Sequence, residues 1–291
     1  MRKVIYKFFL FYFLLFILEC NSTCADTKES WQDLSGEHFI VYFTGEDGFA
    51  REILNKAEVY YQRIATDLGY PRYSEFWLWD KRVKIYLYPN RDSFLSSTGQ
   101  PTWSHGMADY NKKIIASYAG SNEFLCSILP HEMAHLIFRD FVGFKGEIPL
   151  WLDEGVAQWE EEPKRKQIKH MAKQFLDRDG LLSLEDMMRL DIRNIRYKEN
   201  IYIRPTRTKD GKEGILFLSA DMLIDTYYLQ SASLVGFLIE RYGSDNFAHF
   251  CRQLRDGKTF KEALLSVYST YIKSMAEFEE RWIDYVDKGG Q

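Results

Sequence analysis

The sequence His-Glu-Met-Ala-His at residues 131–135 has the residue types and the spacing to hold a metal ion. Residues four apart on an α-helix point from nearly the same side, so the imidazoles of His131 and His135 can reach one ion. Glu132 lies about 100° around the same helix from His131. It can therefore contact a water at the ion without being a ligand, as a general base must.

A third ligand is expected from the segment that follows. After His135 the pattern predicts a turn near residues 143–146 and a second helix that begins after Pro149. Glu154 lies one turn into this second helix and can face back toward the two histidines. Two imidazoles and one carboxylate, with the fourth position open to water, form the ligand set of a catalytic zinc site.

Pro130 stands immediately before the first histidine, inside the helix predicted over residues 122–141. A proline inside a helix removes one backbone donor and favours a bend. We therefore expect a kink just before His131. The other face of this helix is strongly apolar, which is typical of a central, buried helix.

These residues resemble the gluzincin zinc metallopeptidases, specifically the peptidase-MA-like group related to the aminopeptidase N type. The resemblance lies in H-E-x-x-H, eighteen intervening residues, and a Glu within Trp-Leu-Asp-Glu-Gly. It covers about residues 37–242 in the order of elements, and is tight only over 125–160 and 227–243. The resemblance implies that His131, His135 and Glu154 bind Zn²⁺ and that Glu132 is the catalytic base.

A tyrosine is the second catalytic residue that the resemblance implies. In related enzymes a Tyr from the region of residues 227–232 donates a hydrogen bond to the oxyanion. Tyr228 is the candidate and Tyr227 its rival. A phenol suits this task because it stabilises the intermediate without adding a charge. An aromatic residue that only packs at a helix start fits the same sequence.

The chain also departs from the related enzymes. It has no Gly-x-Met-Glu-Asn segment, with which the aminopeptidases hold a free amine, so exopeptidase action is unsupported. Residues 104–109 occupy roughly that place, which makes His105 a candidate substrate contact or an ordinary loop residue. The strand after them could pair with an extended peptide. Asp153, beside Glu154, is either an orienting partner for a histidine or an exposed helix residue.

The pattern of apolar residues predicts an α+β fold: a small N-terminal mixed β-sheet with a helix, followed by a mainly helical portion. The resemblance implies that this portion is zincin-like, as in thermolysin. The predicted strands are 38–43, 83–88 and 113–118, with a helix at 50–68. Further helices are predicted at 122–141, 150–175, 226–242, 245–256, 259–269 and 274–286. Residues 190–220 are expected to form a long surface loop or lid.

Composition and charge narrow the class of protein. The 291 residues are 46% hydrophobic, with a formal net charge of -4, which argues against a nucleic-acid-binding surface. We expect a single catalytic domain over residues 26–291, with the sheet and zinc helices at about 37–162 and the helical C-terminal portion at 163–291. The opposed charge runs at 160–162 and 164–166 predict a solvated helix face.

The first 25 residues resemble a signal peptide, with basic residues at the start and an apolar run over residues 8–18. Cleavage after Ala25 would leave a secreted or cell-envelope protein. Lipidation at Cys20 and membrane association through an uncleaved segment remain alternatives. An exported location would permit a disulfide between Cys126 and Cys251, although two buried free thiols fit the sequence equally.

The sequence therefore predicts an exported zinc metallopeptidase. It would hydrolyse peptide bonds in a peptide or protein substrate with a metal-activated water and Glu132 as general base. The alternative is an inactive zinc-fold binding module for peptides or envelope components. The sequence leaves the oligomeric state open.

Overall fold

The described part of the chain combines a five-stranded sheet with a majority of helices, and the predicted α+β class is confirmed at this level. The structure is a computed structural model that describes residues 30–70, 77–102, 104–143, 148–192, 202–207 and 213–289. By their contacts, residues 31–291 group into one unit. The predicted signal peptide, with Cys20 and Ala25, lies outside the described residues.

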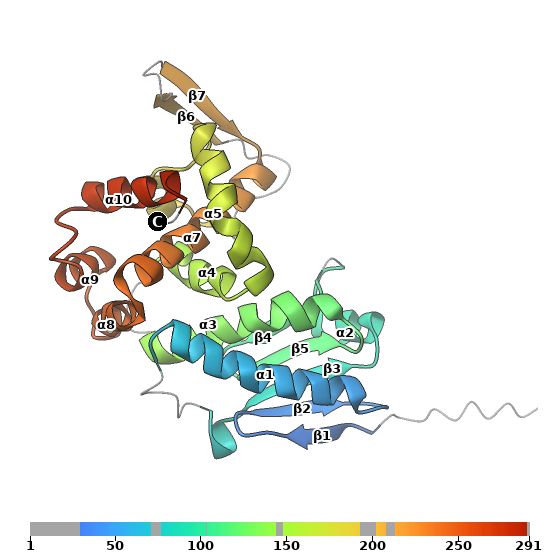
Figure 1. The fold of residues 1–291 in the computed structure, drawn as a ribbon. Helices are drawn as coiled ribbons and strands as arrows, with labels where there is room; N and C mark the ends of the chain where they lie inside the picture. Colours follow the sequence, from blue (N-terminus) through green and yellow to red (C-terminus); the bar gives the residue numbers. More distant parts are fainter. Residues whose placement is uncertain are drawn as a thin grey trace, which may run out of the picture. The chain divides into compact units, whose positions relative to one another are not determined.

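The strands of the sheet lie in the order β1-β2-β3-β5-β4 (Figure 1). The central pairs β2–β3 and β3–β5 are parallel, whereas the edge strands β1 and β4 pair antiparallel, so the sheet is mixed. The sequence does not predict the two edge strands, because both are short and β1 has a single large apolar residue. The strands are β1 Gln32–Ser35, β2 Phe39–Phe43, β3 Val83–Tyr88, β4 Met107–Asp109 and β5 Ile114–Tyr118.

One face of the sheet is covered by helices α1 (Gly48–Asp67) and α3 (Leu129–Val142) (Figure 1). Alternate residues of β2 and β3 are buried on it, because successive side chains of a strand point to opposite faces. Helix α1 packs against both β2 and α3. The sheet thus forms the support on which the helix with the His-Glu-Met-Ala-His sequence lies.

Pro130 lies near the start of α3. The five residues before this helix, Phe124–Ile128, form a π-helical turn, η3. Proline has no backbone N–H to donate, and the first turn of an α-helix is the place where this loss is best tolerated. The wider π-helical turn before α3 changes the hydrogen-bonding pattern at this point. The predicted helix over 122–141 therefore consists of two segments, and the winding changes where the sequence predicts a kink.

The predicted helix over 150–175 is also divided, into α4 (Leu150–Trp159) and α5 (Glu162–Asp177). Glu161, between them, has an extended backbone. Pro163 has no N–H to continue the hydrogen bonding of α4 and instead stands in the first turn of α5. The break turns the start of α5 toward the two histidines, as described below.

The C-terminal half is mainly helical but contains a β-hairpin. The expectation of a long surface loop over 190–220 is wrong here, because β6 (Tyr202–Arg207) and β7 (Glu213–Leu218) pair antiparallel. The remaining helices are α2 Arg91–Thr98, η2 Trp79–Lys81, α6 Leu184–Arg189, α7 Ala220–Tyr242, α8 Ser244–Arg255, α9 Phe260–Val267 and α10 Met275–Asp287.

Helix α7 is the central helix of this half. It is long and apolar enough to cross a membrane, but most of that apolar segment is buried inside the protein. Two glycines allow close packing between α4 and α7. A Cβ added at Gly155 would lie 2.4 Å from the carbonyl oxygen of Ser231, and one at Gly236 would lie 2.4 Å from the Trp159 ring. Gly155 thus holds the turn of α4 that carries Glu154 directly against α7.

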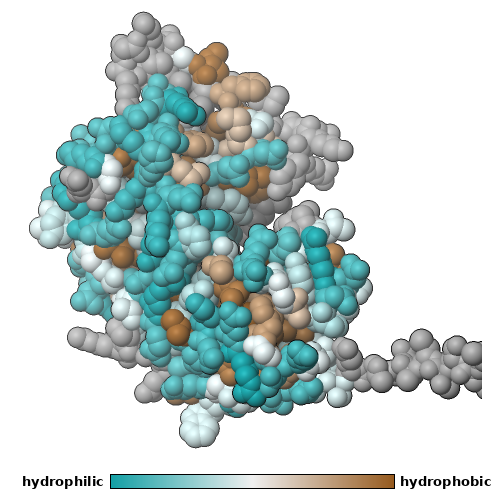
Figure 2. Space-filling model, turned by 45° about the vertical axis from the view of Figure 1, so that its right-hand side comes forward, coloured by the Kyte–Doolittle hydropathy of each residue, from teal (hydrophilic) through white to brown (hydrophobic). Residues whose placement is uncertain are grey.

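Exposed apolar side chains are few among the described residues. Ile215 and Phe217 on β7 and Met222 in the first turn of α7 are among them. Figure 2 shows a largely hydrophilic face, with apolar patches near the top, at the height of the β6–β7 hairpin in Figure 1, and others in the lower half. Both candidate disulfide cysteines are free thiols: Cys251 is buried in α8, whereas Cys126 is exposed in η3. No disulfide joins them.

Candidate metal centre

His131 and His135 project from one side of α3, one helical turn apart. Their Nε2 atoms lie 3.2 Å from each other, and the ring planes meet at 79°. His135 is buried, and His131 is partly exposed. Each imidazole therefore presents one ring nitrogen to a shared point, as the four-residue spacing predicts.

Glu154 on α4 supplies a carboxylate at the same point. Its Oε2 atom lies 3.6 Å from Nε2 of His135, and one ligand atom from each of the three residues lies within 4.8 Å of the others. The packing of α3 against α4 brings them together. In the described part of the chain, no other cluster of His, Cys, Asp or Glu side chains has this arrangement.

The distances between these donor atoms suit a tetrahedral zinc ion. Zinc–nitrogen bonds of about 2.0–2.1 Å at tetrahedral angles place two ligand nitrogens about 3.3 Å apart. The two Nε2 atoms are 3.2 Å apart. Two imidazoles and one carboxylate are also the ligand types of catalytic zinc sites. The residues present therefore fit zinc in their chemistry, and the two imidazoles also fit it in their spacing.

Asp153 orients His135. Its Oδ1 lies 2.8 Å from Nδ1 of His135, and Oδ2 accepts a hydrogen bond from Nε of Arg139 at 3.1 Å. Burial raises the pKa of Asp153, but His135 and Arg139 outweigh it and hold that pKa well below its usual range. An ionised carboxylate only accepts, so Nδ1 of His135 must carry the hydrogen. The lone pair on Nε2 is then directed at the metal position.

His135 is correspondingly held in a strongly negative environment. Burial lowers its pKa, but the carboxylates of Asp153 and Glu154 outweigh this and raise the pKa to about 10. The same carboxylates favour any cation at this position, whether a proton or a metal ion. Of the two alternatives for Asp153, the structure has the buried partner of a histidine and not the exposed helix residue.

Glu161 has the corresponding place beside His131. Its Oε1 lies 3.0 Å from Nδ1 of His131 and 2.9 Å from Nζ of Lys164. Burial raises the pKa of Glu161, but His131 and Lys164 outweigh it and lower that pKa. Sequence reasoning missed this residue, because Glu161 lies in a run of charges that predicts a solvated face. The break between α4 and α5 is what turns it inward.

The prediction of a solvated face is wrong for Glu160 as well. This side chain is fully buried, with Oε2 2.9 Å from Nη2 of Arg165 and 3.6 Å from Nη2 of Arg63. Burial raises the pKa of Glu160 to about 8, although Arg165 and Arg63 oppose the shift. Glu162 and Lys164 are exposed, as the charge pattern predicts.

Tyr110, in the turn between β4 and β5, is a further residue at the site. Its ring lies edge-on to His135, with 5.9 Å between ring centres, and the Arg139 guanidinium stacks 4.0 Å from the Tyr110 ring centre. Burial, together with the charge of Glu132, raises the pKa of Tyr110. A single Tyr in a loop between strands carries no sequence signal for this role. Its position depends on the pairing of β4 with β5.

Glu132 and His131 line a cavity of about 330 Å³. Its other walls come from the loop before β4, from η3 and from the α4–α5 junction. His105 belongs to the first of these walls, and its Nδ1 lies 2.7 Å from the hydroxyl of Tyr118. The lining residues are Ser104, His105, Gly106, Glu123, Ser127, Ile128, His131, Glu132, Gln158, Glu161 and Lys164. The cavity therefore brings the candidate base and the candidate substrate contact to one space.

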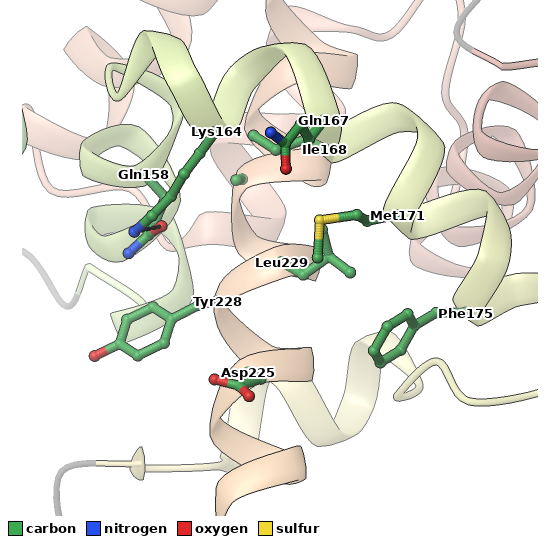
Figure 3. Close-up of a pocket in the computed structure, with 10 residues that line it drawn as sticks. Gln158, Lys164, Gln167, Ile168, Met171, Phe175, Asp225, Tyr228 and Leu229 are labelled. Atoms are coloured by element: carbon green, nitrogen blue, oxygen red, sulfur yellow. Dashed lines mark hydrogen bonds between the residues drawn. The ribbon is translucent and has the colours of Figure 1, made fainter. Parts of the chain in front are cut away.

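The two candidate tyrosines on α7 have different surroundings. Tyr227 is fully buried, and its hydroxyl donates to the carbonyl of Leu190 at 3.5 Å. Tyr228 is half-buried and lines a second cavity, in which its phenol lies on the side of Gln158 (Figure 3). Gln158 and Lys164 line both cavities. Tyr228, not Tyr227, therefore lines a cavity that shares two wall residues with the cleft at His131 and Glu132.

His38, His170 and His249 belong to no group of three potential metal ligands in the described part of the chain. His38 is buried, stacks on Tyr61 and lies 2.6 Å from a carboxylate oxygen of Glu58. His170 and His249 are on exposed helix faces, each beside a glutamine one turn further on. They are packing and surface residues.

Comparison with known protein families and curated sequences identifies no relative of this chain. No protein-family model matches the chain, and no curated protein sequence matches it significantly. The geometry of the site and the sequence pattern are therefore the observations on which a function can be argued.

Proposed function

We propose that the chain is an exported zinc-dependent metallopeptidase of the gluzincin type, with a thermolysin-like zincin fold. The observation that carries this proposal is the convergence of His131, His135 and Glu154 on one point. Both histidines are oriented by buried carboxylates, Asp153 and Glu161. Helical packing alone does not account for two such carboxylate–histidine pairs beside a third ligand, whereas a metal site needs them.

A bound zinc ion would supply Lewis acidity, polarising a substrate carbonyl and lowering the pKa of a water. Glu132 is the residue that handles the proton. It follows His131 directly and lines the same cavity, so its carboxylate can take a proton from an attacking water and later deliver it to the leaving amine. This role needs a carboxylate near the ion that is not itself a ligand.

Tyr228 is the proposed donor to the oxyanion. It lines a cavity whose wall shares Gln158 and Lys164 with the cleft at His131 and Glu132, and the hydroxyl of its neighbour Tyr227 donates to the buried carbonyl of Leu190. A neutral phenol stabilises a developing negative charge without competing with the metal for ligands.

The proposed substrate is a peptide or protein. The cleft is lined by polar groups from several elements, among them the loop that leads into β4. The expectation that the strand at 113–118 pairs with a peptide is wrong, because β5 is paired on both sides, with β3 and β4; β4 is the edge strand. An extended peptide can add to such an edge through its backbone. Export is supported by the pattern of the first 25 residues, which combines basic residues with an apolar run.

Metal content and hydrolysis of an unfolded protein test the proposal. The purified chain should bind one zinc per molecule and cleave an unstructured protein such as reduced casein. A chelator should abolish cleavage, and added zinc should restore it. Stoichiometric zinc without cleavage would identify the chain as a binding module, and the absence of zinc binding would overturn the proposal as a whole.

A further inference from the structure

The face of the sheet that turns away from α1 and α3 carries four aromatic side chains. Tyr42 on β2 and Tyr86 on β3 are partners in the register, and their rings stack with 4.8 Å between ring centres. Tyr88 is two residues further along β3, so it points to the same face. Trp31, just before β1, completes the group. We call these four residues the aromatic platform.

Trp31 crosses a whole strand to reach this group. Strand β2 lies between β1 and β3, yet the indole contacts two rings of β3. Its ring centre lies 5.6 Å from that of Tyr86 and 5.4 Å from that of Tyr88, with angles of 78° and 87° between the ring planes. Stacking of Tyr42 on Tyr86 is ordinary cross-strand pairing, but such pairing does not account for the added indole.

The aromatic platform is accessible, and its hydroxyl groups are uncommitted. Trp31 is 44% exposed, and the three tyrosines are partly exposed. Among the described residues, the hydroxyls of Tyr42, Tyr86 and Tyr88 have no hydrogen-bond partner. A tyrosine with an exposed ring and a free hydroxyl offers both an apolar contact and a donor or acceptor. The platform therefore combines aromatic area with hydrogen-bonding capacity.

The surroundings of the aromatic platform carry no net charge. The register places Asp33 of β1 beside Tyr42, and Lys84 precedes Tyr86 by two residues on β3. These two are the acidic and basic residues that β1, β2 and β3 place on this face. A nucleic acid or an anionic lipid surface needs an excess of basic groups. The balance of charge on this face therefore favours an uncharged ligand.

We propose that the aromatic platform binds a neutral polysaccharide chain. A pyranose ring presents C–H groups on its faces and hydroxyls around its rim, so it can lie against an aromatic ring while phenol groups bond to the rim. A stable protein–protein interface uses about 20–30 residues on each side, whereas four aromatic residues suit a few sugar units. The proposed export would bring the chain to the polysaccharides of cell surfaces.

Binding at this face is separate from the metal centre. The side chains of β2 and β3 alternate, so the aromatic platform and the residues that pack beneath α1 and α3 lie on opposite faces of the sheet. The inference therefore goes beyond the proposed peptidase activity and does not depend on it.

Co-sedimentation with insoluble polysaccharides and calorimetry with soluble oligosaccharides test this inference. The purified chain should sediment with cellulose or chitin and bind the hexasaccharide of the same polymer. Trp31→Ala should weaken hexasaccharide binding at least about tenfold, because it removes the most exposed ring. Tyr86→Phe keeps a ring and loses one hydroxyl, so it should weaken binding about two- to tenfold.

Trp79→Ala is the matched control. Trp79 is 83% exposed, and it lies on η2, outside the aromatic platform. This variant should bind the hexasaccharide like the unmodified chain. The zinc content of Trp31→Ala should also match that of the unmodified chain, because the metal centre is on the other side of the sheet.

The results that would overturn the inference are distinct. They are a failure of the unmodified chain to bind either polymer or its hexasaccharide, and unchanged binding by Trp31→Ala. Sedimentation with phosphatidylglycerol vesicles in place of polysaccharide, lost in Trp31→Ala, would assign the face to a lipid surface. A dimer in analytical ultracentrifugation that Trp31→Ala abolishes, without sugar binding, would assign it to a second copy of the chain. None of these results bears on zinc binding or peptide hydrolysis, so the peptidase proposal is tested separately.

Discussion

The Nδ1 atom of His131 lies 3.0 Å from the carboxylate of Glu161, at the N-terminal end of α5. Each of the two histidines thus has its own carboxylate partner. Asp153 from α4 contacts His135, and Glu161 contacts His131. The two carboxylates fix the tautomer of both rings, so both Nε2 atoms are available to one ion.

Glu161→Gln should weaken zinc binding by about ten- to a hundredfold, because the amide no longer raises the basicity of His131 or fixes its ring. A competition titration with a fluorescent zinc chelator measures this. Glu162→Gln, next in the chain but exposed and paired with Arg63, is the control and should bind zinc like the unmodified chain. Equal affinity in both variants would remove Glu161 from the site.

Glu132→Gln should retain zinc and lose hydrolysis by several orders of magnitude, because the amide cannot take the proton of the attacking water. The readouts are metal content by elemental analysis and the turnover of an unfolded protein substrate. Turnover close to that of the unmodified chain would assign the base to another residue.

Tyr228→Phe should lower kcat by about 10²–10³-fold, since it removes one donor to the oxyanion, with a smaller change in KM. Tyr227→Phe is the matched control, because its hydroxyl contacts the Leu190 carbonyl in the interior. That variant should keep its kcat. Steady-state kinetics on a single peptide distinguish the two residues, and a normal kcat for Tyr228→Phe would leave it a lining residue only.

Glu160→Gln should change how stability depends on pH. Burial raises the pKa of this carboxyl from 4.5 to about 8 in the folded chain, so folding favours its protonated form. Its contribution is fully present below about pH 4.5 and is lost as the pH rises through 8. The free energy of unfolding of the unmodified chain should therefore fall relative to Glu160→Gln over this range, by up to about 5 kcal/mol.

Urea unfolding of the metal-free chain at several pH values between 5 and 9 measures that difference. The corresponding difference between the unmodified chain and Glu162→Gln should stay flat, because Glu162 is exposed. A flat difference for Glu160→Gln would mean that Arg165 and Arg63 keep Glu160 ionised throughout.

Gly155→Ala should destabilise the fold by about 1–3 kcal/mol and weaken zinc binding, because the new methyl group meets the backbone of Ser231 and pushes α4 away from α7. Urea unfolding and the chelator competition measure the two effects. Gly48→Ala is the control. An added Cβ there meets no atom within 4 Å, so the substitution should be neutral or slightly stabilising.

Local sequence patterns predict much of the fold and of the candidate site. The central strands β2, β3 and β5 alternate clearly, and the spacing of His131 and His135 predicts a shared direction on any regular helix. Glu154 was accessible because its helix follows within a short connection. The edge strands, the β6–β7 hairpin and the short helices have weak periodicity. Whether they form depends on the strands they pair with or the elements they pack against.

The sequence by itself determined which residues can act as ligands and base, because a helix places residues four apart on one side whatever surrounds it. Only the tertiary structure decided which residues orient them. Glu161 lies in a run of charged residues and Asp153 stands beside another acidic residue, and nothing local distinguishes a buried partner of a histidine from a solvated side chain. The break at Pro163 and the close approach of α4 to α7 at Gly155 make that distinction, since burial depends on contacts between elements far apart in the chain.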